Sequence, residues 1–370
     1  MAYRKFRIAR DRRLIVLLSV AVLAAGVVIV GWVAAGAVRH MLSGPRVIGV
    51  GAAPDALALS PDGRTLYVAN GVSDDSPANG HAVTVVSPTT GKVGRRIDIG
   101  GAAWKIAVSP DGRTLYAMLV ADSGGQNGMV IVNLVTGHVA ARVRFKYGAA
   151  DFAVAPRGQV VYVLAEVERG SMQVISLDSA GRRRDGVNIL VPGDSEDLSI
   201  SPQGDLLYVA GGRDGARHSG VIEEFPVNAG RVGSSITLED NVIELAVSQD
   251  GRTLYALGDN DSCPRGGGAC TSGTASVAII DAVSGKQVKY VHLEMSPVAL
   301  AVARSGRTVY VLSAEGGIIP VSTTTGKAGR GIRVTGMFAD PSSLDLLMAP
   351  DGRTAYVAEA NKGVAIVPLP

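Results

Sequence analysis

Four carboxylates and one lysine stand at equivalent positions in a sequence that repeats itself. Each comes four residues before the start of a short motif of the type SPDGRTLYVAN. The residues at that position in the successive copies are Ala56, Lys105, Asp151, Asp197, Glu244, Ala299 and Asp345. Like charges that are brought together raise one another's pKa unless a cation or hydrogen bonds intervene. This set is therefore the leading candidate for chemistry in the chain.

Two interpretations of the set follow from its residue types. In the functional one, the side chains form a polar or cation-binding site, with Ca²⁺ as the metal because it prefers oxygen ligands. Its ligands would be Asp151, Asp197, Glu244 and Asp345. In the structural one, each acid accepts hydrogen bonds from the neighbouring repeat, and Lys105 balances one of them. Trp104 is then either a packing residue or an aromatic side chain of the site that could stack on a sugar.

Motifs for other chemistry are missing from the sequence. It contains no HExxH zinc motif, no GxSxG nucleophile turn and no GxxxxGK[ST] phosphate loop. We therefore predict no cofactor apart from the possible Ca²⁺. The pattern favours binding over catalysis without deciding between them.

The repeat itself predicts the fold. Seven copies of the motif begin at residues 60, 109, 155, 201, 248, 303 and 349, and a period near 46 residues is typical of a solenoid, propeller or array. Pro-Asp-Gly is a turn sequence, because proline presets φ at the second turn position and glycine takes the left-handed site. Each period holds four strand-like runs, which in the first copy are 56–60, 65–70, 82–87 and 92–99. Four antiparallel strands repeated seven times predict an all-β, seven-bladed β-propeller over residues 45–370.

The two ends of the repeat region predict how the ring closes. The last copy has runs at 343–349, 354–360 and 363–369 and then lacks a fourth strand, while PRVIGVG (45–51) is an orphan strand before the first copy. Pairing them would make the N-terminal strand the outer edge of the last blade. The tyrosine that recurs in each motif is expected to pack between blades; its copies are Tyr67, Tyr116, Tyr162, Tyr208, Tyr255, Tyr310 and Tyr356.

The N-terminal segment predicts a membrane anchor. Residues 14–38 are 25 positions without a charge, enough to span a bilayer as a helix. Six basic residues precede them within 1–13, so the positive-inside rule keeps 1–13 in the cytoplasm and sends the stalk 39–44 and the propeller outside. A cleaved signal peptide is the alternative, with Ala35-Gly36-Ala37 as the cleavage site. Either way the propeller is exported, to an extracellular or periplasmic location.

Charge and cysteine content agree with this location. Residues 41–370 hold 29 basic and 32 acidic residues, which gives no electrostatic footprint for nucleic acid. The only two cysteines, Cys263 and Cys270, are separated by a glycine-rich stretch. In an oxidising compartment such a pair is expected to form a disulfide; free thiols and a metal site are the alternatives.

The repeated SPDGRTLYVAN resembles the YVTN family of β-propeller repeats, including YncE-like exported propellers. Tyr67-Val68-Ala69-Asn70 comes closest to the tetrapeptide of the family name, and the later copies drift to YALG, YVLS and YVAE. The resemblance covers nearly all of 45–370 and implies an extracytoplasmic propeller without assigned chemistry. More distantly the pattern is similar to lactonase-type seven-bladed propellers, but no catalytic motif matches theirs.

The resulting functional hypothesis is a membrane-anchored binding module. Its ligand would be a protein, a glycan or a small molecule, bound where the less regular loops and the charged set share one face. Those loops are 71–81, 120–128, 166–171, 211–220, 258–275, 314–316 and 360–362. The alternatives are a hydrolase or lyase of the lactonase type, with Lys105 or Arg213 as electrophilic partner of the carboxylates, and a structural component of the cell envelope.

Overall fold

The computed structural model describes residues 45–51, 54–70, 81–119, 128–168, 170–192, 195–213, 216–259, 274–334, 345–359 and 363–370. Within this part of the chain the secondary structure consists of β-strands, and no helix in it is long and apolar enough to span a membrane. The predicted anchor 14–38, the tail 1–13 and the stalk 39–44 lie outside the described residues, as do Cys263 and Cys270.

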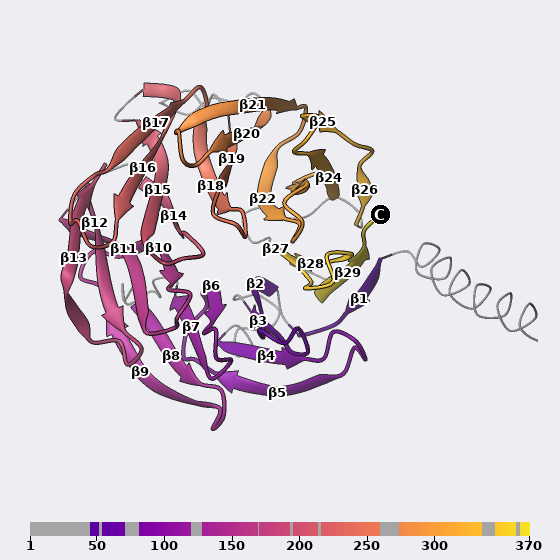
Figure 1. The fold of residues 1–370 in the computed structure, drawn as a ribbon. Helices are drawn as coiled ribbons and strands as arrows, with labels where there is room; N and C mark the ends of the chain where they lie inside the picture. Colours follow the sequence, from indigo (N-terminus) through magenta and orange to yellow (C-terminus); the bar gives the residue numbers. More distant parts are fainter. Residues whose placement is uncertain are drawn as a thin grey trace, which may run out of the picture. The chain divides into compact units, whose positions relative to one another are not determined.

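The described strands form seven antiparallel sheets, which are the predicted blades (Figure 1). Each of the first five pairs its four strands in chain order, as the repeat required. Blade 1 is β2 (Pro54–Leu59), β3 (Leu66–Asn70), β4 (Ala82–Val86) and β5 (Val93–Asp98); blade 2 is β6 (Ala103–Val108), β7 (Thr114–Leu119), β8 (Gly128–Asn133) and β9 (His138–Arg144); blade 3 is β10 (Ala149–Val154), β11 (Val160–Glu168), β12 (Ser171–Asp178) and β13 (Arg183–Val191).

The remaining blades follow the same plan with small changes. Blade 6 has two short outer strands that both pair with β24. Blade 4 is β14 (Ser195–Ile200), β15 (Leu206–Arg213), β16 (Ala216–Pro226) and β17 (Ser234–Leu238); blade 5 is β18 (Asn241–Val247), β19 (Thr253–Asp259), β20 (Ala275–Asp281) and β21 (Lys286–Leu293); blade 6 is β22 (Pro297–Val302), β23 (Thr308–Ser313), β24 (Gly317–Ser322), β25 (Lys327–Ala328) and β26 (Ile332–Arg333); blade 7 is β27 (Leu346–Met348), β28 (Thr354–Glu359), β29 (Gly363–Pro368) and β1 (Arg46–Ile48).

Blade 7 closes the ring as predicted. β1 pairs antiparallel with β29, with Ile48 opposite Val364. Gly363 makes this close approach possible: its φ is 120°, and a Cβ built on it would lie 2.1 Å from the Ile48 carbonyl oxygen. No side chain fits there, so the sequence must keep a glycine where the N-terminal strand joins the last blade.

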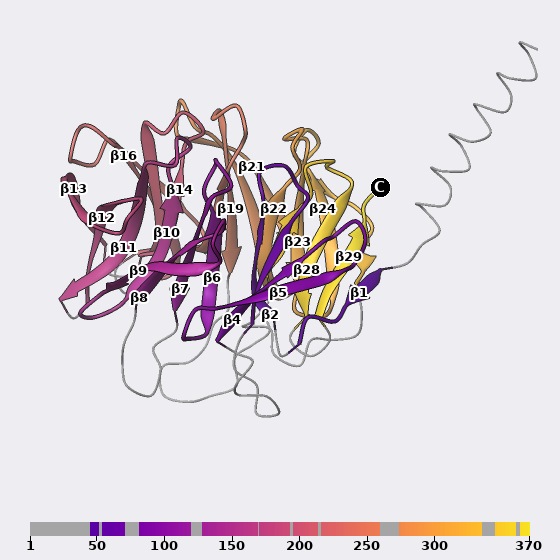
Figure 2. The same cartoon turned by 90° about the horizontal axis from the view of Figure 1, so that it is seen from below.

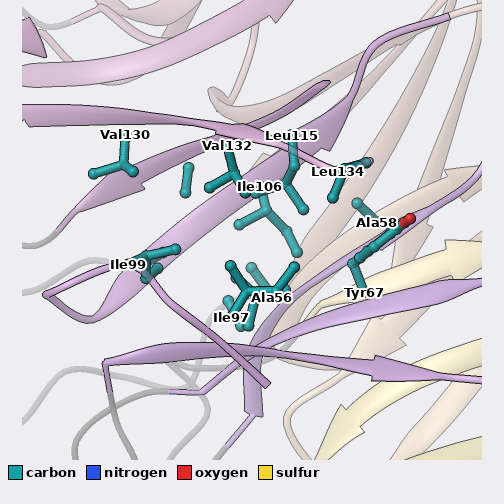
Figure 3. Packing of buried hydrophobic residues seen from close by; sticks show 14 residues of the cluster. Ala56, Ala58, Tyr67, Ile97, Ile99, Ile106, Leu115, Val130, Val132 and Leu134 are labelled. Atoms are coloured by element: carbon teal, nitrogen blue, oxygen red, sulfur yellow. The ribbon is translucent and has the colours of Figure 1, made fainter. Parts of the chain in front are cut away.

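Apolar side chains pack between neighbouring blades. Figure 3 shows the cluster between blades 1 and 2, where Ala56 and Ala58 of β2 meet Ile106 of β6 and Leu115 of β7. Seven such clusters occur among the described residues, and each contains one of the motif tyrosines. All seven tyrosines are buried, so their predicted role in packing between blades is confirmed.

Two hairpins are longer than predicted. The segment 166–171 was expected to be a loop, but β11 runs to Glu168 and β12 begins at Ser171. In 211–220, β15 extends to Arg213 and β16 begins at Ala216. Both segments are rich in glycine and charged residues, yet antiparallel pairing reaches Glu168 opposite Ser171 and Arg213 opposite Ala216. Cross-strand hydrogen bonds outweigh the low strand preference of these residue types.

Candidate functional site

The charged set lies near the start of the innermost strands of the blades, and one of its members, Asp345, lies directly before its strand. In Figure 1 these strands, β2, β6, β10, β14, β18, β22 and β27, surround the centre of the ring, and in Figure 2 the blades stand side by side around it. We call the end of the ring that holds the set the channel mouth. The SPDG turns come after the other end of the same strands, so they form the opposite face.

A β-bulge precedes the key position in six inner strands. The register with the second strand shifts between Ala103 and Lys105, between Ala149 and Asp151, and at the equivalent residues before Ala56, Asp197, Glu244 and Ala299. A bulge leaves one residue unpaired and redirects the side chain that follows. Trp104 is the bulged residue of β6, and its side chain is 37% exposed. Six of the seven positions thus share one backbone feature, while Asp345 lies directly before β27, for which no register shift is seen.

Each acid of the set accepts a hydrogen bond from the inner strand of the next blade. The Leu198 amide donates to Asp151 Oδ2 at 2.8 Å, and the Leu245 amide donates to Asp197 Oδ2 at 3.0 Å. The other two bonds are Leu300 N to Glu244 Oε2 at 2.6 Å and Leu57 N to Asp345 Oδ2 at 2.8 Å. These are the bonds that the structural interpretation required. They tie four pairs of neighbouring blades together at the mouth.

Lys105 forms an ion pair with Asp151. The Asp151 side chain is 2% exposed, and that of Lys105 is 34% exposed, so solvent reaches the pair from the mouth. The Lys105 ammonium also lies 5.7 Å from the centre of the Phe152 ring. Burial disfavours the charged lysine, but the charges of Asp151 and then Asp197 outweigh it and raise the pKa of Lys105. Lys105 is therefore a permanent cation of the site.

The other acids hold their protons more tightly than free carboxylic acids do. Burial, followed by the charge of Asp345, raises the pKa of Glu244 to about 8. Burial and then the Asp151 charge raise the pKa of Asp197 well above its ordinary value. The pKa of Asp345 is also raised by burial, although amide hydrogen bonds oppose this. At neutral pH Glu244 is mostly protonated, so the mouth carries less negative charge than its sequence suggests.

The structure adds one polar residue that the sequence did not indicate. Ser199 Oγ donates to the Leu245 carbonyl at 2.7 Å, two residues after Asp197, which accepts from the Leu245 amide. The backbone of Leu245 in blade 5 is thus held on both sides of its Cα, by two side chains of β14. The only signal for this in the sequence is the alternation Asp197-Leu198-Ser199, because residues two apart in a strand share a face.

The donor set limits what the mouth can bind. Among the described residues no group of three or more His, Cys, Asp or Glu side chains converges as a metal site would. One oxygen of each acid is engaged by a backbone amide, so a Ca²⁺ ion would have to share these carboxylates with the hydrogen bonds between blades. The Ca²⁺ ligand set Asp151, Asp197, Glu244 and Asp345 stays a prediction.

These features define the class of the protein as a seven-bladed β-propeller with a charged channel mouth. The chain is similar in structure to hydrazine synthase of Kuenenia stuttgartiensis, with a TM-score of 0.68 and 18% sequence identity, over 87% of this chain and 96% of that one. Matches extend to 1728 solved chains, so the likeness shows the fold alone. No protein-family model matches the sequence, and no curated protein matches it either.

Proposed function

We propose that this chain is a binding module held at the outer side of a membrane, and that its ligand binds at the channel mouth through a positive charge. The ligand would be an amine-bearing small molecule, or a protein or glycan that presents a cationic group to the mouth and the loops around it. Residues 14–38 would supply the anchor, as their length without a charge suggests.

The observation that carries the proposal is the charge balance of the mouth. It brings together four acids and one lysine, and the lysine is already paired with Asp151. Burial is the first cause of the raised pKa of Glu244, and the negative charge of Asp345 adds to it. A ligand cation beside these two carboxyl groups would favour their ionised forms, so binding would displace a proton from the mouth.

The alternative of a lactonase-type hydrolase has less support. Such an enzyme needs a group that activates a nucleophile within hydrogen-bond reach. In the part of the chain that the structure describes, the mouth acids bond to backbone amides and Lys105 bonds to Asp151. Binding therefore accounts for the site with fewer assumptions than catalysis does.

Binding of a cation is expected to strengthen as pH rises. Calorimetric titration of the full chain with 1,4-diaminobutane, and separately with Ca²⁺, should give an affinity at least about tenfold higher near pH 9 than near pH 6, because the proton on Glu244 competes with the ligand. Glu244→Gln should weaken this pH dependence, and Asp197 and Asp345, whose pKa values are also raised, should account for what remains. Asp351→Asn changes an exposed acid on the opposite face and serves as the control. Equal affinity at both pH values, or unchanged behaviour of Glu244→Gln, contradicts the proposal.

Anchoring is expected to depend on residues 14–38. After cell fractionation, the full chain should sediment with membranes and resist extraction at alkaline pH, because an apolar helix of this length partitions into the bilayer. A chain that begins at Met41 should stay in the soluble fraction. Recovery of a shortened chain that begins just after Ala35-Gly36-Ala37 in the soluble fraction would support the signal-peptide alternative, and recovery of the uncleaved chain there would contradict the anchor.

A further inference from the structure

The face opposite the channel mouth is built from the SPDG turns, which pack on one another around the ring. In four pairs of neighbouring blades the proline of one turn lies against the glycine of the next turn, whereas between blades 4 and 5 the Gln203 side chain lies nearest to Gly251. A Cβ built on Gly158 would lie 3.2 Å from Pro110, and one on Gly63 would lie 2.9 Å from Pro350. The same contact joins Gly112 to Pro61 and Gly204 to Pro156. These prolines fill the space between neighbouring turns.

Blades 5 and 6 lack this proline. Gln249 stands in its place in blade 5 (SQDG), and Arg304 stands there in blade 6 (ARSG). The glycine that should receive Gln249 is Gly306, and a Cβ on it would meet only Tyr255 Oη, at 3.5 Å. Between blades 5 and 6, where both turns lack the proline, no side chain of the blade 5 turn fills the space beside Gly306.

A cavity of about 330 Å³ occupies this opening between blades 5 and 6. It is lined by Ser248, Gln249, Asp250 and Tyr255 from one blade and by Arg304 and Ser305 from the other. Tyr255 is 2% exposed, and its hydroxyl donates to the Gly306 carbonyl at 3.0 Å, which fixes one wall of the cavity. Pockets for small ligands begin at about 300 Å³ and orient the ligand with a few polar groups.

The charges in the cavity favour an anionic group on the blade 6 side. Relative to the APDG turn of blade 7, the ARSG turn of blade 6 replaces proline with Arg304 and aspartate with Ser305. One acid is removed and one cation is added at the same turn. Among the described residues Arg304 takes part in neither ion pair that the structure shows. A guanidinium in this situation is suited to bidentate binding of a carboxylate.

The blade 5 side offers acceptors and donors for hydroxyl groups. Asp250 Oδ1 accepts from Ser248 Oγ at 2.6 Å and from the Arg252 amide at 3.0 Å. These two bonds use one oxygen and fix the carboxylate, so that the other oxygen can accept from a ligand. Gln249 carries both an amide donor and a carbonyl acceptor. The cavity thus has a cation, Arg304, on one side and two groups that can bind hydroxyls, Gln249 and Asp250, on the other.

We propose that the cavity between the turns of blades 5 and 6 binds a small carboxylate that carries hydroxyl groups. Arg304 holds the carboxylate, and Gln249 and Asp250 hold the hydroxyl groups. The site lies at the opposite end of the inner strands from the channel mouth, so it is independent of the function proposed above. The site arises from two substitutions at the proline position of the repeat. Gln249 in place of proline leaves the space beside Gly306, and Arg304 in place of proline adds the positive charge.

Calorimetric titration of the full chain with tartrate, at constant ionic strength, tests the site. Tartrate should bind, succinate should bind about tenfold more weakly because it lacks the hydroxyl groups, and uncharged sorbitol should give no heat of binding. Arg304→Ala should weaken tartrate binding by at least about tenfold. Gln249→Pro restores the turn of blades 1 and 2, fills the cavity and should abolish binding without lowering the melting temperature.

The matched control is Arg157→Ala. Arg157 lies in the turn of blade 3 (APRG), which keeps its proline, so this variant should bind tartrate like the wild type. Three results would overturn the proposal: no heat of binding with tartrate in the wild type, wild-type affinity in Arg304→Ala or Gln249→Pro, or an equal loss in Arg157→Ala, which would show that surface charge alone attracts the anion.

Discussion

Replacing Asp151 with alanine is expected to lower the free energy of unfolding by about 3 kcal/mol, because the change leaves a half-buried cation and a backbone amide without the buried carboxylate that pairs with both. Asp151 is 2% exposed and is bonded at once to Lys105 and to the Leu198 amide of the next blade. Urea unfolding of the full chain, followed by circular dichroism, measures the effect.

A matched variant separates the ion pair from the hydrogen bond between blades. Asp345 accepts the Leu57 amide in the same way but forms no ion pair in the described part of the chain. Asp345→Ala should therefore cost only about 1 kcal/mol. Combining Asp151→Leu with Lys105→Met should recover part of the lost stability, because the double variant leaves no lysine charge without its partner. If Asp151→Ala costs no more than Asp345→Ala, the ion pair does not stabilise the ring.

Stability is expected to fall by roughly 2 kcal/mol as the pH rises from about 5 to about 8.5. A carboxyl group whose pKa is raised on folding binds its proton more tightly in the folded state. Between its ordinary pKa and about 8, the folded chain therefore holds more protons at Glu244 than the unfolded chain does. Rising pH removes that advantage. Asp197 and Asp345 act in the same direction, since the pKa of each is also raised.

Glu244→Gln should flatten this pH dependence and make the protein more stable than the wild type near the alkaline end. Thermal unfolding across the pH range measures both effects. Asp111→Asn is the control with the opposite sign, because hydrogen bonds from Ser109 and the Arg113 amide lower the pKa of Asp111. Asp111→Asn should lower the stability by a constant amount at neutral and alkaline pH, and its difference from the wild type should disappear only in acid, where Asp111 itself becomes protonated. A wild-type stability that is constant or rises between about pH 5 and 8.5 would contradict the assigned protonation of Glu244.

The sequence was sufficient for the architecture because the repeat marks every blade in the same way. The turn Pro61-Asp62-Gly63 separates β2 from β3 at the predicted place, and Gly63 has the expected left-handed φ of 71°. The orphan strand at 45–51 and the missing fourth strand of blade 7 together predicted the pairing of β1 with β29. The turn could be predicted from three consecutive residues, and the closure of the ring could be predicted by counting the strands in the first and last repeats.

The details of the two candidate sites depend on contacts between blades, which the sequence does not state. The bulge that precedes Asp151 comes from a register shift against β11. The partner of Asp197 is a backbone amide, and any residue other than proline at position 245 would supply one. The cavity beside Arg304 was visible in the sequence only as a departure from SPDG, and its meaning required the packing of each proline on the next glycine.

The pairing of β1 with β29 also sets an order for biosynthesis. β1 is the first strand of the propeller to be made, yet its partner β29 comes more than 300 residues later in the sequence, since Ile48 pairs with Val364. Throughout translation β1 has no partner in its own blade, and contacts between such distant residues form slowly. A nascent or prematurely terminated chain that lacks residues 363–368 therefore has no β29, and β1 and β28 each keep an unpaired edge. Unpaired strand edges and exposed apolar surface of this kind promote aggregation and are recognised by chaperones and proteases.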